Sequence, residues 1–283
     1  MPDSVSLTEC SYGKTGVRLI KIERNGHRDH MRELNVTMQL YGSFAAAYCD
    51  GDNSLVLPTD TMKNMVYVLA GEGPIDEIEC FAMRLGNHFL RRHSHIHHAR
   101  ISITEKLWQE AGGCEKTGGC FQSSGPHFRT AAADVNRSEL SFRSGVKDLK
   151  ILKTTKSAFS GFLKDEYTTL KDTEDRLLSS KVNAEWLHKS LSSEQRPSWK
   201  AVCDVLVEIF AEHYSRSVQH TLYAMGREVL ERFPGVEEIK LSMSNQHCIP
   251  VDLKSFKMTN RNEVFLPTEE PAGIIEALLT RAG

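Results

Sequence analysis

The chain has 283 residues, a formal net charge of −2 and an apolar fraction of 40%, values typical of a soluble globular protein large enough for two domains. This charge argues against nucleic acid or an anionic membrane as the main partner, and no apolar run is long enough to span a bilayer. The start of the sequence lacks a secretory signal, and its seven scattered cysteines favour a reducing compartment. We therefore expect a cytoplasmic protein.

Two strands joined by a polar turn at 25–29 are predicted first, over residues 17–22 and 36–41, and apolar and polar side chains alternate in the second of them. A helix is predicted over 60–69 and is broken by the Gly- and Pro-rich stretch 71–74. A second helix follows, and its apolar face at helical spacing contains Ile75, Ile78, Ala82, Leu85 and Phe89. A strand over 101–107 closes this half.

The second half repeats the order. Strands are predicted over 140–154 and 177–187, and helices over 199–214 and 218–233, where apolar residues recur every three or four positions. A last strand is indicated by the alternation of Ile239, Leu241 and Met243 with polar residues. The repeated order of strands, helices and strands predicts two similar α+β domains.

We place these domains at 1–136 and 137–283. The Gly- and Ser-rich stretch 112–125 is interpreted as a loop before the boundary. Each domain has helices for only one face of an antiparallel sheet, and its sheet edges need covering. Joining sheets edge to edge across subunits would protect them.

The start of the helix at residue 60 is the first candidate binding site. Pro58 is followed by the hydroxyl of Thr59 and the carboxylate of Asp60, a pattern typical of a helix start. The free N–H groups and the helix dipole there suit an anionic ligand. Most such patterns are only caps, so this one gains weight from further segments: Tyr12-Gly13-Lys14, Phe159, Arg176, Ser217-Val218-Gln219-His220 and Ser244-Asn245-Gln246-His247.

Together, and in this order, these segments resemble the urate oxidase (uricase) family over nearly the whole chain. The resemblance implies the tunnelling fold (T-fold), in which the subunits of a homotetramer combine into a β-barrel wrapped by helices, with active sites at the interfaces. It also implies an enzyme without metal or other cofactor that converts urate, O₂ and water to 5-hydroxyisourate and hydrogen peroxide. Eukaryotic members are typically peroxisomal, whereas the ending Thr280-Arg281-Ala282-Gly283 is not a peroxisomal address, which favours a bacterial, cytoplasmic relative.

By this resemblance, Lys14, Thr59 and His247 form a proton relay. A lysine base needs a lowered pKa and a hydroxyl as conduit, and a histidine can move protons near neutral pH. Asp60 would offer its backbone N–H to the purine while its side chain caps the helix. Lys14, Thr59 and Asp60 would come from one subunit and the remaining site residues from its neighbour.

The substrate-holding residues implied are Arg176, Gln219, Val218, Phe159 and Asn245. A guanidinium fork and a terminal amide both suit the edge of a purine, and an aromatic ring suits its face. The backbone N–H of Val218 is a further ligand contact, and Asn245 would hold water or dioxygen above the ring.

Each of these residues also has a purely structural interpretation. Arg176 could balance surface acids, Phe159 could belong to the core, and Asn245 could close a strand. We expect Phe162 to be a core residue, Gln246 to point away from the site and Cys248 to be incidental.

The histidine run is interpreted as solvated or interfacial rather than as a metal site, because its spacing mixes a helix end with a strand start: His88, His93, His95, His97 and His98. The rival functions are another purine- or pterin-binding T-fold enzyme, which would need a zinc site, and a non-catalytic purine- or metal-binding protein on this scaffold.

Overall fold

The structure is a computed structural model that describes residues 5–24, 29–111, 119–190 and 195–281. It divides into two compact units, Met1–Ser144 and Gly145–Gly283. The domain boundary between residues 136 and 137, which we placed from the sequence, remains a prediction. No helix within the described part of the chain has the length and apolar character needed to cross a membrane.

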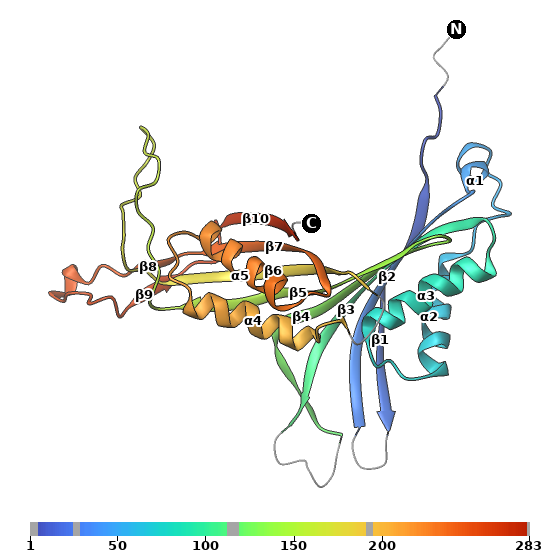
Figure 1. Ribbon diagram of the computed structural model, residues 1–283, viewed down its shortest axis with the longest axis horizontal. Coiled ribbons are helices and arrows are strands. Elements are labelled where there is room, and N and C mark those ends of the chain that lie inside the picture. The colour runs from blue at the N-terminus through green and yellow to red at the C-terminus, as the bar shows by residue number, and fades with distance from the viewer. Residues whose placement is uncertain (1–4, 25–28, 112–118, 191–194, 282–283) are drawn as a thin grey trace. The chain divides into compact units, whose positions relative to one another are not determined.

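The first unit arranges antiparallel strands in the order β1-β2-β3-β4. Its elements, coloured blue to green in Figure 1, are β1 (Ser11–Arg24), β2 (Asp29–Gly42), α1 (Ala45–Cys49), α2 (Thr59–Glu72), α3 (Ile78–Arg92), β3 (Ile96–Glu110) and β4 (Phe121–Asn136). The alternation predicted in β2 is confirmed, because Val36, Met38 and Leu40 are buried. Helix α3 packs on β3 and β4, and α2 packs on β1.

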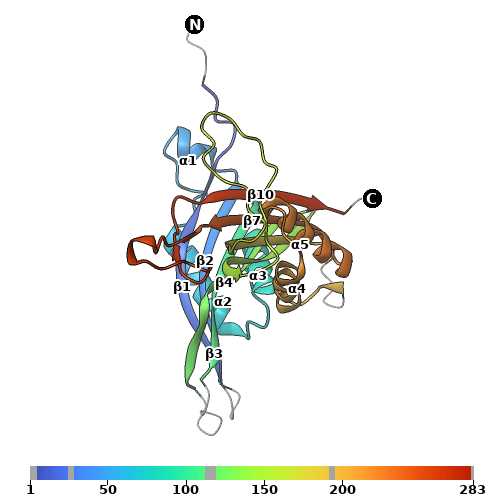
Figure 2. The same ribbon diagram turned by 90° about the vertical axis from the view of Figure 1, so that its left-hand side faces the viewer.

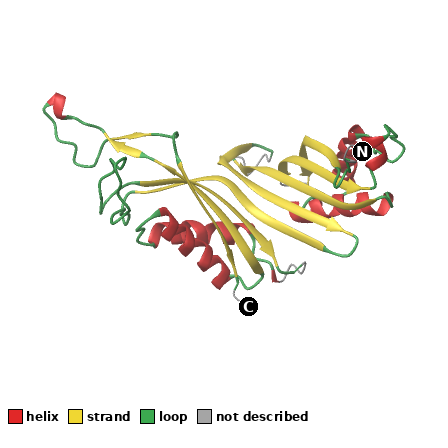
Figure 3. Ribbon diagram, turned by 90° about the horizontal axis from the view of Figure 1, so that it is seen from above, coloured by secondary structure: helices red, strands yellow, loops and turns green. Residues whose placement is uncertain are grey.

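The second unit arranges its strands in the order β5-β6-β7-β10. Its elements are β5 (Leu140–Lys153), β6 (Leu178–His188), α4 (Trp199–Glu212), α5 (Val218–Arg232), β7 (Val236–Gln246), β8 (Cys248–Pro250), the 3-10 turn η2 (Lys254–Phe256), β9 (Phe265–Pro267) and β10 (Gly273–Thr280). Helices α4 and α5 lie side by side, and α5 packs on β7 and β10 (Figures 1 and 2). The helices thus cover one face of the strands (Figure 3).

The α+β fold class and the repeated order of elements are confirmed, with two errors. The strand containing Ile239, Leu241 and Met243 is not the last, because β8, β9 and β10 follow it. The second error is the loop predicted over 112–125. Residues 112–118 lie outside the described residues, but β4 begins at Phe121 and contains Gly125. This glycine has a φ of +131°, which glycine tolerates inside a strand, and Gln122 and Ser123 pair with β3. A Gly/Ser-rich composition therefore did not prevent strand pairing.

Two helix glycines allow the helices to approach the sheets closely. A Cβ at Gly86 of α3 would lie 2.6 Å from Cγ2 of Val135, and a Cβ at Gly226 of α5 would lie 2.9 Å from Cδ1 of Leu241. Both distances are shorter than a normal carbon–carbon contact. In each unit, a glycine in the second helix that covers the sheet thus allows close packing on the strands.

We expect Gly86→Ala to lower the free energy of unfolding by about 1–3 kcal/mol, because the added methyl overfills a packed interface. Urea denaturation measures this change. Gly71→Ala is the matched control: a Cβ there meets nothing within 4 Å, so it should be neutral or stabilising by up to about 1 kcal/mol through helix propensity. Equal stability of the two variants would contradict the close-approach argument.

Candidate active site

The first unit brings Lys14 close to the start of α2. The hydroxyl of Tyr12 accepts a hydrogen bond from the backbone N–H of Leu57 at 2.8 Å, which ties the segment before the helix to β1. The carboxylate of Asp60 has a lowered pKa, mainly because Lys63 donates to it and to a smaller extent because of the charge of Lys14. Lys14 therefore lies near the first turn of α2.

The backbone of β1 fixes the position of Lys14. A Cβ at Gly13 would lie 1.9 Å from the carbonyl oxygen of Met38, so only glycine allows β1 and β2 to approach this closely. The strand pairing shifts register between Lys14 and Val17, where Gly16 has a φ of +73°. This bulge is of the kind that re-aims a side chain next to a site.

The predicted capping role of the Asp60 side chain is wrong. The residue before the helix is Pro58, which has no side-chain acceptor, and Asp60 is the second helical residue. Its carboxylate instead accepts from Lys63 Nζ at 2.5 Å and from Asn64 Nδ2 at 3.1 Å. The backbone N–H groups of Thr59 and Asp60, in the first turn, have no acceptor within the helix and suit a ligand.

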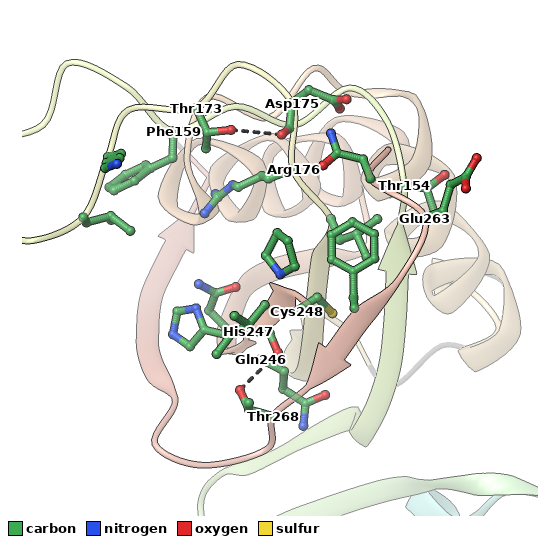
Figure 4. A pocket seen from close by; sticks show the side chains of 18 of the residues that line it. Thr154, Phe159, Thr173, Asp175, Arg176, Gln246, His247, Cys248, Glu263 and Thr268 are labelled. Carbon is green, nitrogen blue, oxygen red and sulfur yellow. Dashed lines mark hydrogen bonds between the residues drawn. The ribbon is translucent and has the colours of Figure 1, made fainter. Parts of the chain in front are cut away.

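The second unit contains a cavity of about 1050 Å³, which a close view shows in Figure 4. Its lining comes from the segment between β5 and β6, from the end of β7 with β8, and from the segment around β9. The predicted residues Phe159, Arg176, Asn245 and His247 all line it. Segments far apart in the sequence thus place these groups around one cavity.

Arg176 presents an unused donor. Its backbone N–H donates to the carbonyl oxygen of Ser157 at 3.0 Å, and its Nε donates to Ser157 Oγ at 3.3 Å. Its Cζ lies 5.2 Å from the centroid of the Phe159 ring. Its Nη2 is buried and has no hydrogen-bond partner among the described residues. Burial lowers the pKa of the guanidinium, but arginine remains charged in proteins.

Phe159 is held in a loop rather than in the core. Its backbone exchanges two hydrogen bonds with Thr173, at 2.7 and 2.9 Å. Its ring stacks on Phe162 with a centroid distance of 4.8 Å and an interplanar angle of 11°. Phe162 is only partly buried and the adjacent Leu163 is 92% exposed, so the prediction of Phe162 as a core residue is wrong. It packs against the proposed stacking ring instead.

The start of α5 lies beside the loop that contains Phe159. The backbone N–H of Ala158 donates to Ser215 O at 2.7 Å, just ahead of the helix. Ser217 caps α5 by accepting from the backbone N–H of His220 at 3.1 Å. Val218 is buried and Gln219 is exposed, and neither belongs to the residues that line the cavity.

Asn245 and His247 lie at the end of β7 and just beyond it. The backbone N–H and Oγ1 of Thr268 both donate to the carbonyl oxygen of His247, at 2.8 and 3.1 Å (Figure 4). Gln246 is buried and lines the cavity, as does Cys248. The expectation that Gln246 points away from the site is wrong, because the regular alternation of β7 breaks at its last residues.

The histidine run does not gather into a ligand set. His98 Nε2 lies 2.9 Å from Asp134 Oδ1, and its ring stacks on Tyr41. His93 and His95 meet edge to face at 5.8 Å between ring centroids. Within the described ranges, no group of three or more His, Cys, Asp or Glu side chains could hold a metal ion.

Comparison with known proteins gives one consistent result. The family model described as Uricase matches residues 10–133 and 142–276. The chain is 39% identical to the uricase of Arthrobacter globiformis over 279 residues, covering 99% of this chain and 91% of the relative. It is 37% identical to the uricase of Danio rerio over 286 residues, covering 98% and 96%.

Solved structures agree with the sequence relatives. The crystal structure of uricase from Arthrobacter globiformis superposes with a TM-score of 0.94 at 38% identity, covering 99% of this chain and 96% of the other. The crystal structure of urate oxidase from Bacillus sp. TB-90 superposes with a TM-score of 0.84 at 25% identity, covering 96% and 100%.

Proposed function

Because the chain belongs to the uricase family, we propose that it oxidises urate with O₂ and water to 5-hydroxyisourate and hydrogen peroxide, without metal or organic cofactor. The observation that carries this proposal is the buried, unpartnered Nη2 of Arg176 beside the ring of Phe159 in one cavity. A buried donor without an acceptor is costly, so its retention is explained by a ligand that supplies the acceptor.

Arg176 and Gln219 hold the purine edge in this proposal. The guanidinium donates to neighbouring oxygen and nitrogen acceptors, and the amide of Gln219 both donates and accepts. The N–H of Val218, in the first turn of α5, adds a donor at the positive end of a helix. Phe159 stacks on the purine face.

Lys14, Thr59 and His247 move the protons. Lys14 takes a proton through the hydroxyl of Thr59, and His247 returns or releases the proton. The urate anion passes two electrons to O₂, which with two protons becomes hydrogen peroxide, and water adds to the oxidised ring near Asn245. The backbone N–H of Asp60 contacts the purine. The overall reaction balances, since one O₂ and one water become hydrogen peroxide and the hydroxyl of the product.

Lys14, Thr59 and Asp60 belong to the first unit, whereas His247 and the other site residues belong to the second. We therefore propose that each site joins the first unit of one subunit to the second unit of another in a homotetramer. The outer strands support such an assembly. Ile20 and Ile22 on β1 are 58% and 38% exposed, and Ile274 and Leu278 on β10 are 72% and 57% exposed. Exposed apolar edge strands favour pairing with another chain. Pairing of these edge strands between subunits would build the T-fold barrel.

The test is the loss of urate ultraviolet absorbance with purified, chelator-treated protein in air, with peroxide measured in parallel. We expect oxygen-dependent loss of urate with one peroxide formed for each urate consumed. Binding of urate without loss would favour a non-catalytic purine-binding protein. Activity that returns only with added metal would overturn the cofactor-free proposal.

A further inference from the structure

Lys153, the last residue of β5, carries a buried cation that the proposed chemistry does not use. The residue is only 8% exposed. Its Nζ donates to the carbonyl oxygens of Phe210 at 3.0 Å and His213 at 2.6 Å, and it lies 5.2 Å from the centroid of the Phe210 ring. The last carbonyls of a helix lack helical donors and carry the negative end of the dipole. Lys153 therefore closes the C-terminal end of α4.

The residues that follow Lys153 hold the turn between α4 and α5, residues 213–217. The carbonyl oxygen of Lys156 accepts from the backbone N–H of Ser215 at 2.9 Å, and Ala158 donates to Ser215 O at 2.7 Å. Ser215 itself is fully buried. The α4–α5 turn is thus fixed at one end by the ammonium of Lys153 and in its middle by the backbone beyond it.

The other end of the turn leads directly into the proposed urate contacts. His213 Nε2 lies 3.2 Å from His220 Nδ1 in the first turn of α5. Ser217 caps this helix through the backbone N–H of His220. Val218 and Gln219 are the first two helical residues. A shift of the turn would therefore move both of them.

We infer that Lys153 is a positioning residue for substrate: its ammonium ties the end of α4 to β5, and this tie places the N–H of Val218 and the amide of Gln219 for urate. The inference rests on the proposed urate-binding role of these two groups. Without the tie, two helix-end carbonyls lose their donor, and the α4 end of the turn can shift although Ser215 keeps its two backbone hydrogen bonds. Affinity for urate then falls, while the relay groups Lys14 and Thr59, in the other unit, keep their own supports.

The tie is sensitive to pH. The charged and titratable groups around it are Lys156 on the following segment, His213 at the end of α4, and His220 and Arg227 on α5. Burial and, to a smaller extent, the charge of Lys156 lower the pKa of Lys153 to about 8. The ammonium therefore becomes a neutral amine at mildly alkaline pH, and its attraction to the helix-end carbonyls weakens as the pH rises through that value.

The experiment measures urate binding to the full-length protein without O₂, so that no turnover occurs, and then steady-state kinetics in air. Lys153→Met should raise the urate Kd and KM about tenfold, because two charge-assisted hydrogen bonds are lost, with kcat at saturating urate within about twofold. Lys153→Arg keeps the charge and should restore Kd to near the wild-type value. Lys147→Met, at an exposed position of the same strand, is the matched control and should leave Kd unchanged.

A wild-type Kd in Lys153→Met would overturn the inference, and so would a Lys153→Arg variant that binds as weakly as Lys153→Met. If Lys153→Met does not fold, the pH dependence decides. The urate Kd of the wild-type protein should rise between pH 7 and 9, while the Kd of Lys153→Arg stays constant. If the Kd of both proteins changes with pH in the same way, the result contradicts a role for the Lys153 charge. Failure of the wild-type protein to bind urate at any pH would instead remove the proposed function itself.

Discussion

Replacing Lys14 with methionine is expected to lower kcat for urate by about 10²–10⁴-fold, the usual contribution of a general base. Methionine keeps the length of the aliphatic chain, so the fold around β1 should persist. The reason is positional: the close approach at Gly13 and the bulge before Val17 fix this side chain beside the start of α2. Stopped-flow or steady-state loss of urate absorbance measures the effect, and anaerobic urate binding should stay close to wild type.

Arg18→Met is the control for Lys14. Arg18 is a cation of the same strand, its side chain is 76% exposed, and it forms a surface ion pair with Glu33 at 3.5 Å. Because surface ion pairs contribute little, its removal should leave turnover within about twofold. Unchanged turnover in Lys14→Met would remove this lysine from the mechanism, even if the protein proves to be a urate oxidase.

Replacing Arg176 with glutamine is expected to raise the urate KM by about 10- to 100-fold, the size of a lost charge-assisted hydrogen-bond pair. The thermal midpoint of the free protein should not fall in parallel, because the buried Nη2 has no partner among the described residues and is a cost to the empty site. Steady-state kinetics measures the rise in KM, and thermal unfolding measures whether the midpoint stays unchanged.

Arg227→Gln provides the comparison for Arg176, because this arginine of α5 has a side chain that is 54% exposed and pairs with Glu231 at 3.5 Å. Its loss should change KM by less than about twofold. A fall in stability of Arg176→Gln with an unchanged KM would identify Arg176 as a structural residue and would support the interpretation that it only balances charge.

The sequence predicted most of the regular elements because their signals are local. The alternation of Val36, Met38 and Leu40 and the helical spacing in α3 and α5 describe one face of a sheet or helix, and burial follows the same pattern. The strands β4, β8, β9 and β10 were missed, and β1 and β3 are longer than predicted. Pairing with a neighbouring strand, rather than local composition, decides their formation, as Gly125 in β4 illustrates.

The candidate site was predicted mainly from the order of separated motifs, since no single residue carries a distinctive signal. The structure gathers Phe159, Arg176, Asn245 and His247 around one cavity, which spacing alone could not have shown. The capping prediction for Asp60 failed because side chains one turn further along the same helix compete for its carboxylate. The Asp60 carboxylate turns to Lys63 and Asn64 rather than to the helix start.

Lys153 was missed for a related reason. In the sequence it is one more lysine near the end of a predicted strand, and nothing in its neighbours marks it. Only the fold shows that its ammonium reaches the carbonyl oxygens of Phe210 and His213. Buried cations of this kind are invisible to composition and periodicity.

The most direct test of the shared site is complementation between two inactive variants. Lys14→Met and Arg176→Gln chains are co-expressed with different tags, and hybrid oligomers carrying both tags are purified and assayed for loss of urate. If a site joins two subunits, each pairing of unlike chains across such an interface creates one site with both wild-type halves, so random assembly should restore about a quarter of wild-type activity. Hybrids as inactive as either parent would show that Lys14 and Arg176 must come from the same chain, and would contradict the shared site.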